Sequence, residues 1–336
     1  MNSSEPDDAP TADAEGDADG GHAAFSAHGA GDAAPAPPMR RLGWFTPQPD
    51  GNLGITVQAH VLTEKEWAEF EKYAGVVNDM RAFMIDYLAL VADYEAFVAV
   101  DDEIAADASL AINARFLDTP ALVRAQAKAQ RSVSNFLSAG SAFRDRAQKR
   151  LSGRGARAIP SPAALKARIS EIYDASIDYR VTYILRNHAQ HHENPISMCP
   201  IEGARADDGK IAARMRMGLD PQVLAADKKL PAAKRAELLT LDAQLPMAGI
   251  IERTMADFSR IMLFVLEANR QRLIEMAQYA AALFRAFEIP HNAKPVIFNG
   301  FDPTKGPPTT ENCYLFGLDE LTVCVEMLDR LGREVG

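Results

Sequence analysis

Residues 247–288 carry an amphipathic helical pattern of about twelve turns, and this long segment constrains the fold more than any other. A helix of this length is stable in water chiefly because its apolar face packs against other elements. The sequence therefore predicts an all-α fold, a helical bundle with long antiparallel helices. The apolar positions of this segment are Ile250, Ile251, Met255, Phe258, Met262, Phe264, Val265, Leu266, Leu273, Met276, Tyr279 and Phe284.

Several other segments supply partner helices. The capping box 63–66 (Thr-Glu-Lys-Glu) begins a helical pattern that runs to residue 90, and a second stretch covers 103–114. A Thr-Pro pair predicts a helix over 120–152, with Thr119 as its N-cap.

The second half of the chain continues in the same way. Ser161-Pro162 begins a helix that we expect to run into a histidine cluster and to end before Pro195. Asp220-Pro221 restarts a helix as N-cap and first residue, and a short helix near 318–332 closes the chain.

Little β-structure is expected. Residues 54–61 are rich in β-branched side chains and predict a short strand. A minor β-hairpin is expected from 196–201 and 211–217, which flank a loop rich in glycine and aspartate. Residues 290–316 are rich in proline and glycine, so we expect them to be irregular.

The chain divides into three parts. Residues 1–40 form an Ala/Asp/Gly/Pro-rich acidic tail that we expect to be disordered, because it has almost no large apolar side chain to bury. Residues 41–195 are expected to form a helical domain, and 196–336 a β-hairpin and C-terminal helices that pack on the same bundle. Removing the eight acids of residues 1–38 from the net charge of −10 leaves −2, so the remainder is nearly neutral and has no basic patch that would indicate a nucleic-acid partner.

Several function classes lack support. No apolar run approaches the 18 residues that a membrane span needs, and the first residues lack the basic and apolar regions of a secretory signal. The three widely spaced cysteines form no CxxC pair, so we expect reduced thiols and a cytoplasmic location. The sequence also lacks the phosphate-binding loop of NTPases, the dinucleotide-binding glycine motif and the GxSxG motif of α/β-hydrolases.

The segment 186–192 (Arg-Asn-His-Ala-Gln-His-His) contains three of the seven histidines. At 100° per residue, His191 lies about 140° from Arg186 on a helical wheel. His188 and His192 fall instead on the apolar arc, toward the core or the helix end. One broad polar face is expected from Arg180, Tyr183, Arg186, Asn187, Gln190 and His191.

Arg186-Asn187-x-x-x-His191 resembles the Arg-polar-x(3–5)-His motif of the HEPN superfamily, a group of helical proteins that includes metal-independent endoribonucleases. The resemblance covers residues 64–195, where 139–151 and 173–192 look like the two antiparallel helices of a HEPN domain. It implies that His191 is the acid/base, Arg186 the phosphate stabiliser and Asn187 a positioning residue.

The chemistry suits these residue types. RNA can be cleaved by attack of a 2′-OH on its own phosphate, and histidine exchanges protons near neutral pH. A guanidinium matches the geometry of phosphate oxygens. The reaction needs neither a metal nor another cofactor. The remaining residues of the polar face are candidates for substrate binding: Arg180, Tyr183 and Gln190.

The expected partners follow from the same resemblance. RNA is the expected substrate. Because Arg186 and His191 lie at opposite edges of the polar face, one helix presents both to one phosphate with difficulty. HEPN nucleases are implied to line one cleft with motifs from two protomers, so we expect a homodimer across this helix. An antitoxin or other protein partner is a further expectation, and no membrane partner is expected.

Three other interpretations remain open. The domain could be a HEPN-like module that binds a protein or nucleic acid without cleavage. Arg186 could pair with Asp178 or another surface acid, while the histidines cap a helix C-terminus. The His188-x-x-x-His192 spacing could hold a metal ion, with Glu193 and Cys199 as the nearest further ligands.

Overall fold

Helices dominate the computed structural model, as the sequence predicts. It describes residues 39–114, 118–154, 159–191, 196, 199–205, 209–302, 306 and 312–335, without the side chains of residues 154, 190, 191 and 335. The acidic tail predicted for 1–40 therefore lies outside the described residues up to position 38. None of the helices in the described part of the chain is both long and apolar enough to cross a membrane.

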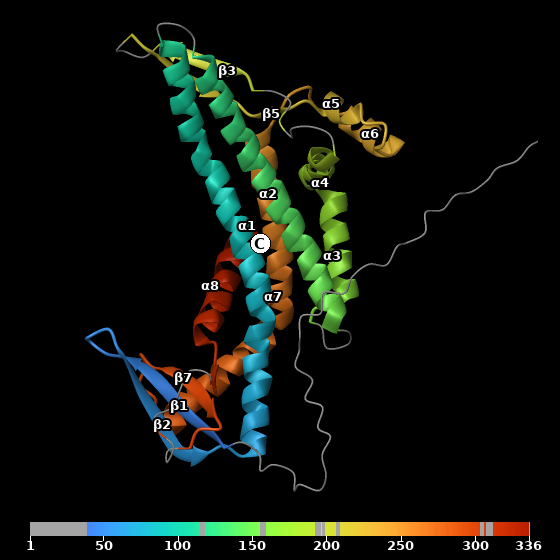
Figure 1. Ribbon diagram of the computed structural model, residues 1–336. Coiled ribbons are helices and arrows are strands. Elements are labelled where there is room, and N and C mark those ends of the chain that lie inside the picture. The colour runs from blue at the N-terminus through green and yellow to red at the C-terminus, as the bar shows by residue number, and fades with distance from the viewer. Residues whose placement is uncertain are drawn as a thin grey trace, which may run out of the picture. The chain divides into compact units, whose positions relative to one another are not determined.

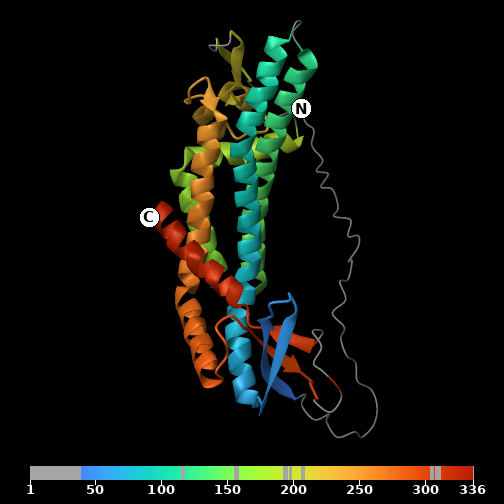
Figure 2. The same ribbon diagram turned by 90° about the vertical axis from the view of Figure 1, so that its left-hand side faces the viewer.

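Three long helices form the bundle. They are α1 (Glu64–Asn113), α2 (Thr119–Arg154) and α7 (Met247–Ala286), which lie side by side (Figure 1, Figure 2). The long helix predicted over 247–288 is confirmed by α7. The sequence analysis was wrong to divide residues 64–114 into two helices. Phe97 and Ile104 are buried, so the apolar face of α1 continues through the expected break.

The helix starts depend on local side chains. The capping box of α1 is confirmed: Thr63 Oγ1 accepts from the Glu66 amide at 3.2 Å, and Glu66 Oε2 accepts from the Thr63 amide at 2.7 Å. At α2, Asp118 Oδ1 accepts from the Ala121 amide at 3.1 Å. Asp118 therefore provides the capping contact that the sequence analysis assigned to Thr119, which lies inside the helix.

Aromatic rings join the three long helices. The Phe258 ring of α7 lies edge-on to Phe136 and Phe143 of α2, with centroid distances of 6.4 and 6.0 Å. Gly140 permits this approach, because a Cβ atom there would lie 2.5 Å from the Phe258 ring. Tyr87 of α1 completes the core and shares a 2.8 Å hydrogen bond with Ser259 Oγ.

The sheet is larger than the minor hairpin that the sequence predicts. Four antiparallel strands lie in the order β2-β1-β7-β8 near the start of α1 (Figure 1). The strand expected over 54–61 is confirmed, but the irregular structure expected over 290–316 is wrong. Val296, Ile297 and Phe298 are almost fully buried, and the short strand they form lies between proline- and glycine-rich segments that hide its pattern. The strands are β1 (Arg40–Pro47), β2 (Leu53–Val61), β7 (Lys294–Asn299) and β8 (Cys313–Leu315).

The second half of the chain adds smaller elements. The hairpin is confirmed, although its first strand begins later than expected and residues 197–198 and 206–208 lie outside the description. Asp220 caps its helix as predicted, since its Oδ1 accepts from the Gln222 amide at 2.8 Å. The elements are β3 (Ile201–Arg205), β4 (Ile211–Met215), β5 (Gly218–Leu219), α5 (Pro221–Ala225), α6 (Ala232–Leu238), β6 (Leu245–Pro246) and α8 (Leu318–Val335).

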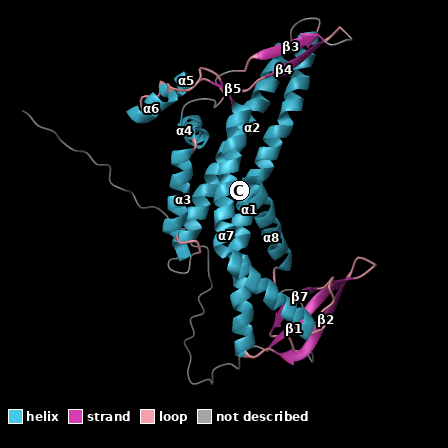
Figure 3. Ribbon diagram, turned by 180° about the vertical axis from the view of Figure 1, so that it is seen from behind, coloured by secondary structure: helices cyan, strands magenta, loops and turns pink. Residues whose placement is uncertain are grey.

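The single helix predicted from residue 162 to the histidine cluster is two helices, α3 (Pro162–Ala175) and α4 (Ile177–His191). Ser176 separates them in an extended conformation, and its Oγ accepts from the Tyr179 amide at 3.2 Å. As a result α4 runs across the long helices: it is seen end-on in Figures 1 and 3 and lengthwise in Figure 2. The antiparallel course that the resemblance implied for residues 177–191 is therefore not observed.

Residues 41–195 and 196–336, which the sequence analysis distinguished, belong to one unit, Met39–Gly336. One apolar core runs through it and takes side chains from both segments, such as Tyr87 and Met262. The site described next lies where α2, α4 and α7 meet.

Candidate functional site

The Arg-Asn-x3-His segment occupies the last turns of α4. The structure describes the side chains of Arg186 and Asn187, whereas those of Gln190 and His191 lie outside the described residues. The roles of Gln190 and His191 therefore stay predictions.

Arg186 carries a positive charge without a carboxylate partner in the described part of the chain. Its Nη1 donates to Asn187 Oδ1 at 3.2 Å, and its Nε is buried with no hydrogen-bond acceptor among the described atoms. The pairing of Arg186 with Asp178, left open by the sequence, is wrong. The Asp178 carboxylate accepts instead from Arg253 Nε and Nη2, at 2.6 and 2.9 Å.

The Arg186–Asn187 hydrogen bond links two residues of the predicted polar face. Asn187 and residue 191 are i and i+4 on α4, so their positions are neighbours on one face of the helix. The hydrogen bond therefore links the Arg186 guanidinium to Asn187, which neighbours position 191 on the helix.

Arg180 and Tyr183, the other described residues of the predicted polar face, have firm contacts. Arg180 donates to Glu237 Oε1 from Nε and Nη2, at 3.0 and 2.6 Å. Its Nη1 donates to the carbonyl oxygens of Tyr173 and Asp174, at 2.6 and 2.7 Å. These backbone acceptors at the C-terminal end of α3 therefore have a hydrogen-bond donor. These contacts give Arg180 a structural role at the α3–α4 corner, and its role in substrate binding stays a prediction.

Tyr183 lies among cations. Arg144 of α2 places its Cζ 4.8 Å from the centre of the Tyr183 ring, and Lys234 of α6 places its Nζ at 5.4 Å. Cation–π contacts of this kind orient a ring without using its hydroxyl group. Helix α6 therefore holds two residues of the predicted substrate-binding set, Arg180 through Glu237 and Tyr183 through Lys234.

His188 points away from the polar face, as the sequence predicts. Its side chain is 12% exposed, and its Nδ1 lies 4.0 Å from Asp227 Oδ2. The described residues include no group of three or more metal-ligating side chains. Because His192 and Glu193 lie outside them, the metal hypothesis stays untested.

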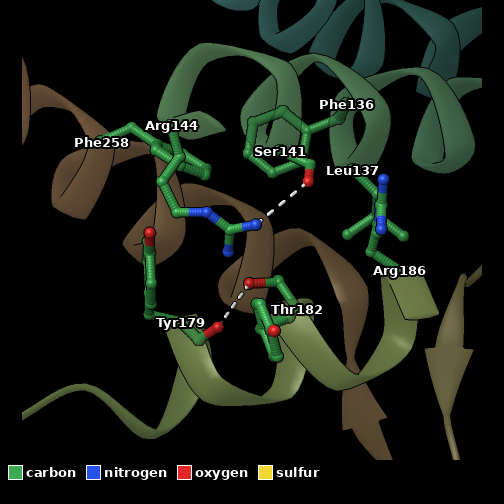
Figure 4. A pocket seen from close by; sticks show the side chains of 9 residues that line it. Phe136, Leu137, Ser141, Arg144, Tyr179, Thr182, Arg186 and Phe258 are labelled. Atoms are coloured by element: carbon green, nitrogen blue, oxygen red, sulfur yellow. Dashed lines mark hydrogen bonds between the residues drawn. The ribbon is translucent and has the colours of Figure 1, made fainter. Parts of the chain in front are cut away.

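A small cavity lies between α2, α4 and α7, and Arg186 lines it (Figure 4). Its volume is about 20 Å³. This is space for about one or two water-sized groups, so neither a base nor a sugar fits inside. Its walls are formed by Phe136, Leu137, Ser141 and Arg144 of α2, Tyr179, Thr182, Tyr183 and Arg186 of α4, and Phe258 of α7.

Arg144 and Tyr179 are not among the residues that the sequence motif predicts for the site. Arg144 lies on another helix and belongs to no motif, so only the packing of α2 against α4 brings it to Tyr183. Tyr179 is 2% exposed, and its hydroxyl makes no hydrogen bond to the described atoms. Burial raises the pKa of Tyr179 to about 12, although the charge of Arg144 and the approach of its guanidinium to the hydroxyl act in the opposite direction.

This shift predicts a loss of stability at alkaline pH. Tyrosine in the unfolded chain ionises near pH 10, whereas folded Tyr179 stays neutral to about pH 12. The stabilising effect of the neutral form is complete below pH 10 and is lost as the pH rises through 12. We expect this loss to be about 2–3 kcal/mol between pH 10 and 12.

Urea unfolding of the wild type and of Tyr179→Phe at several pH values measures the effect. The free energy of unfolding of the wild type should fall by that amount relative to the variant as the pH rises from 10 to 12, and Tyr314→Phe, at a tyrosine 47% exposed, is the control. Parallel pH profiles for wild type and Tyr179→Phe would contradict the prediction.

Comparisons with protein-family models, with curated proteins and with solved structures find no match to this chain. The resemblance to HEPN proteins therefore rests on residues 64–195 themselves and above all on Arg186, Asn187 and His191.

Proposed function

We propose that the chain is a metal-independent endoribonuclease of the HEPN type, with its site at the end of α4. The observation that supports this most is the state of Arg186. Its guanidinium lacks a carboxylate partner in the described structure and is hydrogen-bonded to Asn187, which neighbours position 191 on the helix. A cation free of a fixed anion can stabilise the charge that develops on a phosphate during cleavage.

In the proposed reaction His191 accepts the proton of a ribose 2′-OH. The 2′-oxygen forms a bond to the adjacent phosphorus, and the bond from phosphorus to the 5′-oxygen of the next nucleotide breaks. The leaving oxygen takes a proton from solvent, which gives a 2′,3′-cyclic phosphate and a 5′-hydroxyl end. Arg186 stabilises the charged phosphate oxygens, and Asn187 orients Arg186 through the observed hydrogen bond.

The test is cleavage of end-labelled mixed-sequence RNA in EDTA. We compare the wild type with His191→Ala and Arg186→Ala, and use Arg270→Ala as control because Arg270 is an exposed cation of α7 that pairs with Glu267. We expect cleavage by the wild type and by the control, and its loss in the other two variants, each shown to fold by circular dichroism. Cleavage that persists without His191 would overturn the assignment.

The proposal includes a homodimer in which two α4 helices line one cleft. Size-exclusion chromatography with light scattering at micromolar concentration tests this directly. A monomer that still cleaves RNA would limit the site to one protomer and overturn the dimer.

A second candidate is a HEPN-like module that binds a protein partner, such as an antitoxin, or RNA without cleaving it. The observation that favours it is the contact of α6 with the polar face of α4, where Glu237 engages Arg180 and Lys234 covers Tyr183. Absence of cleavage by folded wild-type protein, together with retained RNA binding in fluorescence anisotropy, would favour the RNA-binding form of this candidate.

A further inference from the structure

The cations around the cavity between α2, α4 and α7 are not all paired with a described carboxylate. Arg144 pairs with Asp145 at 2.8 Å, and Arg260 pairs with the buried Asp257 at 2.6 Å. Arg186 has no such partner among the described residues. A partly buried cation is costly unless an anion balances it, so this wall favours an anionic ligand.

Hydrogen-bonding groups at the cavity are also incompletely used. The Arg186 Nε is buried and makes no hydrogen bond to the described part of the chain, and the Tyr179 hydroxyl lies beside the Arg144 guanidinium without a hydrogen bond of normal geometry. Each such group costs free energy until an acceptor reaches it. Arg144 Nη2 is held by Ser141 Oγ at 3.3 Å, and the Thr182 hydroxyl donates to the Tyr179 carbonyl at 2.9 Å.

The close view shows how these groups are arranged. Arg144 extends from α2 so that its guanidinium lies between Ser141 and Thr182, with Tyr179 and Arg186 to either side (Figure 4). The two guanidinium groups thus come from different helices and line one cavity. Each guanidinium fork can donate to the oxygens of an oxyanion that enters this cavity.

We propose that this cavity binds a single phosphate group between Arg144 and Arg186. The cavity has space for one or two water-sized groups, so one or two oxygens of a phosphate group enter it and the rest of the group stays outside. A phosphodiester would supply the negative charge that Arg186 lacks among the described residues. The proposal rests on the proposed function only in that both use Arg186, and it adds Arg144 as a second phosphate-binding residue.

Thermal unfolding in inorganic phosphate tests the site without any reaction. For a dissociation constant near 1 mM, 10 mM phosphate should raise the Tm of the wild type by about 3 °C over sodium chloride of equal ionic strength. Arg144→Gln should lose most of this rise, whereas the control Arg270→Gln, at an exposed residue paired with Glu267, should keep it. No rise in the wild type, or an equal rise in Arg144→Gln, overturns the proposal.

A second variant tests the site in case Arg144→Gln does not fold. Tyr179→Phe removes only a hydroxyl group and keeps the buried ring, so it should fold normally and show a reduced phosphate-induced rise in Tm. A full rise in Tyr179→Phe, together with loss in Arg144→Gln, keeps the two guanidinium groups as the site and removes only Tyr179 from it.

Competition identifies the source of the phosphate group. If inorganic phosphate displaces a labelled RNA without a terminal phosphate from the wild type but not from Arg144→Gln, the site holds an RNA phosphodiester. If phosphate raises the Tm without displacing RNA, the site holds free phosphate. Either result supports the oxyanion site. Phosphate binding without RNA cleavage would reject only the proposed nuclease, and cleavage without an Arg144-dependent phosphate effect would reject only this site.

Discussion

Replacing Phe258 with alanine is expected to lower the free energy of unfolding by about 3–5 kcal/mol. The ring is 7% exposed and lies edge-on to Phe136 and Phe143 of α2 and to Tyr179 of α4, with centroid distances of 6.4, 6.0 and 5.3 Å. Its removal would leave a space lined by three rings at the junction of three helices. Gly140 has no side chain that could fill this space.

Urea unfolding followed by circular dichroism measures the loss. Phe264→Ala is the matched control, because Phe264 lies on the same helix and is only partly buried. We expect its cost to be clearly smaller. If both variants lose the same free energy of unfolding, Phe258 at the junction of α2, α4 and α7 stabilises the fold no more than a partly buried residue of α7 does.

The second large effect concerns Asp86, a buried carboxylate on α1. Its side chain is 5% exposed and accepts hydrogen bonds from Arg146, at 2.9 Å, and from Arg150, both on α2. Replacing both arginines with methionine would leave the carboxylate buried without these partners. We expect a loss of about 3–5 kcal/mol in the free energy of unfolding.

Two further variants separate this effect from simple loss of surface charge. Adding Asp86→Leu to the double variant should restore much of the stability, since an apolar group can replace a complete buried ion pair. Removing the exposed Arg333–Asp329 pair through Arg333→Met should cost less than about 1 kcal/mol. If the added Asp86→Leu restores nothing, the cost of the double variant comes from lost arginine packing.

The sequence predicts elements well where the signal is local. The capping box at Thr63 and the Asp220 cap each involve residues within three positions of one another, and both are observed. The apolar face of α7 spans so many turns that its pattern has no competing interpretation. These features are properties of one segment and require no knowledge of its neighbours.

Features that depend on distant contacts were missed. Ser176 ends α3 because Arg180 can bind the free carbonyl oxygens there, and Arg180 is itself held by Glu237, 57 positions along the chain. Strand β7 is too short to show a pattern and is defined by its pairing with β1. In the candidate site, the motif identified Arg186, whereas Arg144 reaches the same cavity only through the packing of helices.

The pairing of β1 with β7 also determines how late during synthesis the sheet can be completed. Strand β1 ends at Pro47 and β7 begins at Lys294, so about 250 residues must leave the ribosome before the second edge of β1 has a partner. At roughly 5–20 residues per second this takes about 10–50 s. The β1–β2 hairpin can form early, but it then presents an open strand edge, a template for pairing with other chains. The newly made chain should therefore be most prone to aggregation during synthesis of its long helices and safest once β7 has emerged.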